Sequence, residues 1–412
     1  MHFFYKSILY VMIKKSFFSF LLLISCVSFF AQTTENDAYT FTVVKEVKTT
    51  GVKNQARSGT CWAYSGLSFL ESEILRAGKP EFDLSEMWIV RHCYPAKAEK
   101  YMRLHGNFSL SAGGSFEDVI WVLRNYGIVP QEAYQGLNYG EDKNVHSELD
   151  AATKAYTDAI LRTADRSGSG GLTTAWMRGF EGIVDAYLGT RPEQFTHAGK
   201  QYNPKTFLQS LGINLDDYVS ITSYTHHPFN KPFVLEIPDN WIWGYSYNVP
   251  MKEMLEIATN AINNGYSVAW AADVSEKGFA YAKGVALVPV TDVEEMNDLE
   301  RARWVGLSDR DREARILKLD EPVAEKTITQ EMRQIAFDNF QTTDDHGMHI
   351  VGIAKDKNGN NYFKVKNSWG VEGSKYDGYF YASEAYFLYK TMSIMINKNA
   401  IPKNIANKLG IK

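Results

Sequence analysis

Four residues of this chain have the types and the order needed for acyl transfer through a thiolate. Gln55 lies six residues before Cys61, and His346 and Asn367 follow far downstream. A cysteine becomes a strong nucleophile when a histidine takes its proton, and an asparagine can hold that histidine in place. A glutamine amide can donate a hydrogen bond to the oxyanion that forms. The four residues therefore predict a site for cysteine-dependent hydrolysis.

A helix is predicted to position the cysteine. Apolar residues at positions 63, 67, 70 and 74 form one helical stripe that starts just after Cys61, and Gly78 ends it. The Ser-Gly-Thr sequence at 58–60 supplies a turn and a cap. Because the N-terminus of a helix carries partial positive charge, this position favours the thiolate over the thiol.

Strands are predicted to position the histidine and the asparagine. Residues 349–370 contain two β-rich runs around an Asn-Gly pair, which is typical of a hairpin. Residues 251–265 have helical spacing and are followed by a strand at 266–274. Residues 291–340 carry dense mixed charge and are predicted to be a solvated helical insertion.

Composition narrows the class of protein. The 412 residues are 45% hydrophobic and 14% aromatic, which indicates a folded chain with two or three lobes rather than a disordered one. The net charge of −4 shows no basic bias, so a nucleic-acid partner is not expected.

The first residues have the pattern of a secretory signal. Lys14 and Lys15 precede an apolar run over 17–30, and Ala31 ends it before a polar stretch. We therefore expect residues 1–31 to be a signal peptide and the mature protein to be exported, with no stable transmembrane span. The alternative is lipidation at Cys26, where the sequence loosely fits a lipoprotein cleavage site.

Cysteines and histidines outside the predicted site give no sign of a metal, a cofactor or a disulfide framework. After signal removal Cys61 and Cys93 remain, and Cys93 is expected to be a small buried apolar residue. His226 and His227 lie beside a proline in a predicted loop, and we do not expect them to bind metal.

Several longer segments resemble the bleomycin hydrolase and aminopeptidase C family, a branch of the papain-like cysteine peptidases. The resemblance runs from about residue 45 to residue 405 through FDLSEMW, GGSFEDVIWVLRNYGIVP, NLDDYVSITSYTHHPFNKPF, YNVPMKEMLEIATNAINNGYSVAWAADV and KNSWG. It implies an α+β, papain-like two-lobed fold with helical insertions. The segments it implies are a helical lobe with the cysteine (32–135), a mostly helical insertion (136–245), a helix and strand of the core (246–290), the charged insertion (291–340), a β-rich lobe with the histidine and asparagine (341–398), and a short C-terminal tail (399–412).

The resemblance also implies roles for individual residues. Gln55 and the backbone N–H of Cys61 would form the oxyanion hole, Asn367 would orient the histidine, and Trp369 would cover that pair from water. Of the two histidines, His346 matches the family spacing to a following glycine, whereas His349 would place a lysine there. The remaining implied residues line the substrate cleft or its side-chain pocket: Gly113, Gly114, Gly347 and Ala269.

The expected reaction is hydrolysis of a peptide substrate through a Cys61 thioester, with aminopeptidase action as in the family. In the family a C-terminal arm reaches the cleft, but here only residues 398–412 follow the last predicted strand, so endopeptidase action is an alternative. A non-catalytic binding protein on the same fold is an alternative of another class. Relatives form hexamers, so the resemblance also implies a homo-oligomer.

Overall fold

The computed structural model describes residues 38–164 and 171–412. The predicted signal peptide and Cys26 therefore lie outside the described residues. Within the described part, no helix combines the length and the apolar character that crossing a membrane requires. Residues from Tyr39 to the C-terminus form one compact unit.

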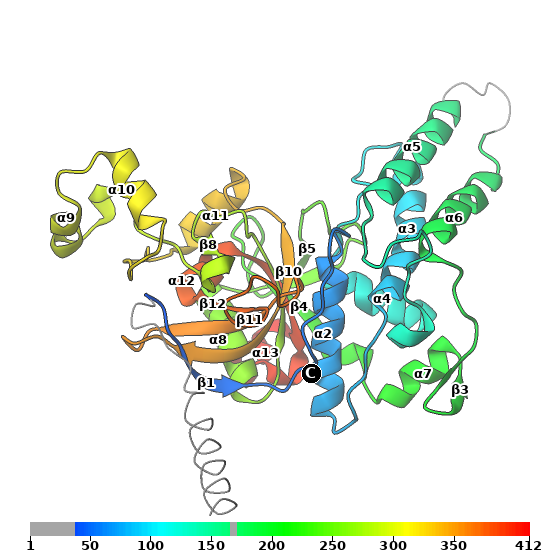
Figure 1. Cartoon of the computed structure of the whole chain (residues 1–412), viewed down its shortest axis with the longest axis horizontal. Coiled ribbons are helices and arrows are strands. Elements are labelled where there is room, and N and C mark those ends of the chain that lie inside the picture. Colours follow the sequence, from blue (N-terminus) through cyan, green and yellow to red (C-terminus); the bar gives the residue numbers. More distant parts are fainter. Residues whose placement is uncertain (1–37, 165–170) are drawn as a thin grey trace, which may run out of the picture. The chain divides into compact units, whose positions relative to one another are not determined.

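Helices that follow the first strand build one lobe around a shared apolar core (Figure 1). Helix α2 (Cys61–Arg76) is buried along almost its whole length, which explains why its apolar stripe is flanked by small residues. In Figure 1 it stands between the remaining helices of the lobe and the sheet. Those helices are α3 (Glu86–Arg103), α4 (Phe116–Tyr126), α5 (Ser147–Ala164), α6 (Ala175–Leu188) and α7 (Pro204–Leu211).

A mixed sheet forms the second lobe. Its strands run in the order β5-β6-β4-β13-β7-β10-β11-β12-β9-β8, and β1 pairs with β10. The bounds are β1 (Thr42–Glu46), β4 (Tyr218–Thr222), β5 (Pro232–Val234), β6 (Tyr245–Asn248), β7 (Val268–Ala272), β8 (Phe279–Ala280), β9 (Val285–Ala286), β10 (His346–Lys355), β11 (Asn361–Lys366), β12 (Tyr379–Ser383) and β13 (Thr391–Asn397). Helices α8 (Met251–Asn263) and α12 (Glu384–Lys390) pack against it.

The predicted hairpin is confirmed by the antiparallel pairing of β10 with β11. Gly359 turns the chain between them with a φ of +86°, a value that favours glycine. The charged insertion contains α9 (Asp298–Trp304), α10 (Asp309–Ile316) and α11 (Gln330–Asp338). A small hairpin of β2 (Phe195–His197) and β3 (Lys200–Tyr202) lies outside the main sheet.

The structure corrects one of the expected segments and adds detail to another. Residues 136–245 are helical only as far as Leu211, because the β-branched run at 218–222 joins the main sheet as β4 and is followed by β5 and β6. In the short C-terminal tail at 399–412, helix α13 (Lys403–Leu409) buries Ile405 and Leu409 in the core beside α8, and Lys408 pairs with Glu253.

A buried histidine in the helical lobe predicts acid sensitivity. The ring of His146 is fully enclosed, and neither nitrogen has a partner among the described residues. Burial lowers its pKa from 6.5 to about 4, so between those values the unfolded chain takes up a proton that the folded chain refuses. The free energy of unfolding therefore decreases as the pH is lowered from 6.5 towards 4. In His146→Leu, the loss of unfolding free energy between pH 7 and pH 5 is expected to be smaller than in the wild type by about 2 kcal/mol.

Urea unfolding curves of both proteins at the two pH values measure this difference. The wild type and the variant share every other titrating group, so their difference isolates the histidine. Equal losses in the two proteins would show that His146 is already charged, or reached by water, in the folded state.

Candidate active site

The sulfur of Cys61 lies at the N-terminus of α2, in a cleft between the two lobes. Cys61 is the first residue of the helix, and the backbone N–H groups of Trp62 and Gly347 are directed at its sulfur. The same cleft is lined by His346 from the first position of β10. The structure thus brings the predicted nucleophile and the predicted base to one cavity from opposite lobes.

The surroundings of Cys61 favour the thiol over the thiolate. Burial raises its pKa to about 12, and the nearby carboxylates of Asp239 and Asp344 raise it further, while the two backbone N–H groups oppose the change. The helix N-terminus alone does not offset this burial. A base or an incoming positive charge must assist its ionisation.

The imidazole of His346 has a defined tautomer. Its Nε2 lies 2.8 Å from Oδ1 of Asn367, and the backbone N–H of Ser368 donates to the same oxygen at 2.8 Å. Because that oxygen is the acceptor of both bonds, Nε2 carries the hydrogen and Nδ1 is the free base. Burial lowers the pKa of His346 to about 4, so the ring is neutral at physiological pH.

Trp369 covers this pair. Its ring stacks on that of His346 with the centroids 4.8 Å apart and an interplanar angle of 29°. Both His346 and Asn367 are buried. Shielding from water strengthens the bond between them, because the local dielectric is low.

His349 lies on the opposite face of β10 and has a different partner. Lys366 donates to Oγ of Ser68 at 2.8 Å, so the hydroxyl hydrogen of Ser68 is left for Nδ1 of His349, 3.0 Å away. The ring also meets the edge of Phe69 on α2. His349 does not line the cleft.

Gln55 is held by the segment that carries the asparagine. Its backbone N–H donates to the carbonyl of Ser368 at 2.8 Å, and the Ser368 hydroxyl donates to Oε1 of Gln55 at 2.6 Å. This fixes the amide so that Nε2 is the remaining donor, and Nε2 has no partner among the described residues. Ser368 was not predicted from sequence, although it lies within the quoted KNSWG segment.

The predicted cleft residues divide into two groups. Gly114 and Gly347 line the cleft, and Gly113 lies beside it under Asp239. A side chain at 114 would lie 2.7 Å from the ring of Trp62, so glycine is required there. Ala269 is wholly buried in the core, which corrects the prediction.

Three residues that were not predicted line the cleft: Ala271, Asp239 and Asp344. Ala271 follows Ala269 on the same face of β7 and reaches the cavity. Asp239 and Asp344, which also line it, were missed because isolated aspartates in loops have no sequence signature. Asp344 lies two residues before His346, which was the one available signal.

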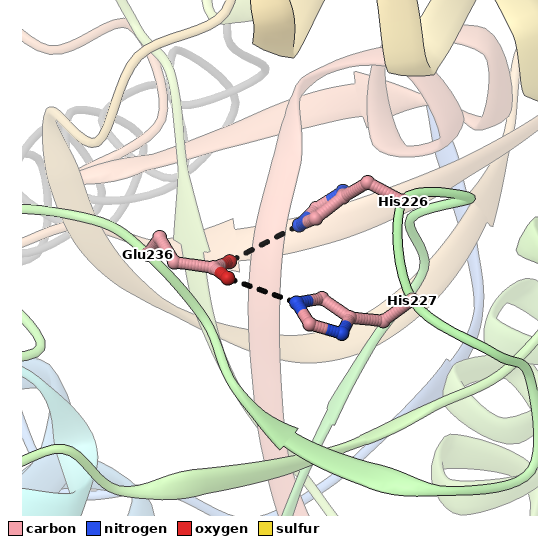
Figure 2. A group of neighbouring side chains, drawn as sticks. All are labelled: His226, His227 and Glu236. Carbon is pink, nitrogen blue, oxygen red and sulfur yellow. Dashed lines mark hydrogen bonds and ion pairs between the residues drawn. The ribbon is translucent and has the colours of Figure 1, made fainter.

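A cluster of His226, His227 and Glu236 is the one group of potential metal ligands in the described part of the chain (Figure 2). Nε2 of each histidine lies within 3.1 Å of a Glu236 oxygen. Gln334 accepts from the backbone N–H of Thr225, so its Nε2 donates to Nδ1 of His226 at 3.1 Å. That leaves the hydrogen of His226 on Nε2, pointing at the carboxylate. Metal binding through Nε2 of His226 would require the hydrogen to be on Nδ1. The hydrogen bonds therefore favour a structural role, in which Glu236 holds the loop that carries the two histidines.

Residues 24–306 and 313–411 match the sequence profile of the peptidase C1-like family. The chain belongs to this family. Among its relatives, Aminopeptidase G of Lactobacillus delbrueckii subsp. lactis is 23% identical over 394 residues, with 87% of this chain and 83% of the relative covered. Aminopeptidase C of Listeria monocytogenes is 23% identical over 400 residues with the same two coverages.

The solved structure of PepW from Lactobacillus rhamnosis HN001 superposes with a TM-score of 0.69 at 20% identity, covering 90% of this chain and 85% of that one. This likeness confirms the predicted papain-like α+β fold. The comparisons also confirm the predicted resemblance to the bleomycin hydrolase and aminopeptidase C family. The protein is a papain-like cysteine peptidase of the peptidase C1-like family.

Proposed function

We propose that this peptidase removes residues from the amino end of peptides, with Cys61 as nucleophile, His346 as base and Asn367 as the group that orients it. The observation that carries the assignment is the 2.8 Å bond from His346 to Asn367 in a cleft that also holds the Cys61 sulfur. The aminopeptidase mode is supported by the names of the relatives.

The reaction follows from the tautomer of His346. Nδ1 takes the proton of the Cys61 thiol as the sulfur attacks the peptide carbonyl carbon, and the carbonyl oxygen becomes an oxyanion. The imidazolium then protonates the leaving amine, which departs as the thioester forms. Water, deprotonated by the same nitrogen, attacks the thioester carbon and releases the acid and the thiol.

Gln55 is proposed to stabilise the oxyanion through Nε2, together with the backbone N–H of Cys61. Gln55→Ala is expected to lower kcat by about 10²–10³-fold with KM little changed. Ser368→Ala leaves the donor present but unanchored and is expected to cost about fivefold, the value of one neutral hydrogen bond. Steady-state kinetics of both variants measure this. Equal losses would mean that Ser368 has a role beyond holding Gln55.

The proposed function is tested with a thiol-directed epoxide and paired substrates. The epoxide is expected to label Cys61 and to abolish activity, and a peptide with a free amino end is expected to be cleaved from that end. Mass spectrometry identifies the labelled cysteine and the products. Internal cleavage of an amino-capped peptide at the same rate would contradict the aminopeptidase mode, and absence of labelling would contradict the nucleophile.

We also propose that the protein is exported with residues 1–31 removed. The Lys14–Lys15 pair, the apolar run at 17–30 and the exit at Ala31 support this. The mass of the mature protein from a cell fractionation distinguishes cleavage after Ala31 from lipidation at Cys26. A homo-oligomer stays a prediction from the resemblance, and light scattering of the purified protein measures it.

A further inference from the structure

One carboxylate oxygen in the cleft has no partner. Oδ2 of Asp344 is shielded from solvent and makes no hydrogen bond within the described residues, although Asp344 lines the cavity that holds Cys61. The backbone N–H of Asp239 donates to this carboxylate. A buried carboxylate oxygen with nothing to accept is costly, so an absent donor fits this position.

A second carboxylate lies next to it and is rigidly placed. Asp239 also lines the cleft and accepts a hydrogen bond from the backbone N–H of Gly114. The loop that carries it is locked by Asn240, whose side chain accepts from the Gly244 N–H at 2.8 Å and donates to the Leu235 carbonyl at 3.0 Å. The indole of the next residue, Trp241, is buried and donates to Asp118.

The surroundings of the two carboxylates favour a cation. Burial raises the pKa of Asp344 well above its usual range, and the charges of Asp239, Asp345 and Glu117 raise it further. Burial likewise raises the pKa of Asp239, which the positive charge of Lys97 partly opposes. The Lys97 ammonium is already engaged by the carbonyls of residues 111 and 113. A positively charged ligand would therefore relieve repulsion that the protein alone leaves in place.

We propose that Asp239 and Asp344 bind the α-ammonium group of a peptide substrate and thereby limit cleavage to its first residue. This rests on the proposed aminopeptidase function and names the groups that would enforce it. The α-nitrogen of a first residue is separated from the scissile carbonyl by a single carbon, so it must lie close to the Cys61 sulfur, where these two carboxylates are.

The position of Asp239 also limits the length of the cleft. Its carboxylate occupies the N–H of Gly114 and lies over Gly113, the pair expected to line the substrate backbone. A substrate with further residues on its amino side would need that N–H and that space. A lysine side chain carries the same ammonium chemistry, but its nitrogen lies several bonds from the backbone.

Substrate binding would also help to activate the nucleophile. Burial is the main cause of the raised pKa of Cys61, and the charges of Asp239 and Asp344 raise that pKa further. An ammonium bound between the carboxylates offsets their charge, which lowers the pKa of the thiol once a substrate is bound.

The test uses alanyl, leucyl and lysyl amidomethylcoumarins, each with a free and with an acetylated α-amine. Wild-type protein is compared with Asp239→Asn, Asp344→Asn and Glu117→Gln. Glu117→Gln is the matched control, since it removes a negative charge near Asp344 without lining the cleft. Asn at 239 keeps an oxygen for the Gly114 N–H, so folding is expected to persist, and thermal melting checks it.

The wild type is expected to prefer each free amine by about 10²-fold in kcat/KM. Either asparagine variant is expected to lose most of that preference through KM on the free amines, and the control to change it less than about twofold. In the wild type alone, KM for free amines is expected to rise above about pH 8, where an α-amine loses its proton, and KM for acetylated substrates to stay level.

Retention of the preference in both variants would overturn the proposal. So would cleavage of the acetylated lysyl substrate that depends on the two aspartates, since it would assign them to a side chain. A wild type that cleaves free and acetylated substrates equally would overturn this inference but leave the peptidase assignment intact. A protein that cleaves nothing and is not labelled at Cys61 would overturn both.

Discussion

His346→Ala is expected to lower kcat by about 10⁶-fold, the loss seen when the base of a comparable triad is removed. The variant lacks Nδ1 of His346, the base proposed to take the proton of the Cys61 thiol, and burial raises the pKa of that thiol to about 12. The leaving amine also loses its proton donor. Single-turnover and steady-state rates on a free-amine substrate measure the change.

His349→Gln is the matched control, because it changes a second buried histidine on the same strand. The glutamine can keep a bond to Ser68, so we expect some loss of thermal stability and a kcat within about tenfold of the wild type. The opposite pattern, with His349→Gln inactive and His346→Ala active, would mean that the Asn367 bond marks a structural histidine.

Cys61→Ala is expected to abolish turnover to a similar extent, about 10⁶-fold, because no thioester can form. Cys93→Ser is its control. Cys93 is buried in the core of the helical lobe and does not line the cleft, so it has neither access to substrate nor the His346 base, and burial holds its pKa well above the usual range. The expected result is an active Cys93→Ser protein that still takes up the epoxide.

Residual activity in Cys61→Ala above about one part in 10⁴ would be incompatible with covalent catalysis at this position. Peptide binding by Cys61→Ala is expected to survive, because the alanine leaves the cleft and its donors in place. Calorimetry with an uncleaved peptide separates loss of chemistry from loss of binding.

The elements that carry Cys61 and His346 were predictable because they depend on local sequence. The helix after Cys61 and the Asn-Gly hairpin after His346 follow from residue periodicity and turn chemistry, and both are present. The choice between two histidines needed the resemblance, since strand alternation shows that they face opposite sides but not which side is the cleft.

Other parts of the site depend on contacts between segments far apart in sequence. Ser368 meets Gln55 across 313 residues, and nothing near either residue indicates the pair. Ala269 and Ala271 share a face of β7, so alternation could not say which reaches the cavity and which lies in the core. The strand at 218–222 was not predicted, because it lies between helical and loop segments. One of its two partners in the sheet, β13, lies far away in the sequence.

The link between Gln55 and the strand that carries Asn367 has a consequence for motion. Backbone contacts join the two segments along one rim of the cleft. The N–H of Gln55 donates to the carbonyl of Ser368, and the N–H of Gly370 donates to the carbonyl of Lys53. Asn54 and Trp369 form a β-bridge between them. A hinge motion that widened the cleft at this rim would break these hydrogen bonds. It would also displace Gln55 from the oxyanion hole. Substrates are therefore expected to enter a cleft that does not open and close. Product release, rather than closure of the lobes, is expected to limit the turnover rate.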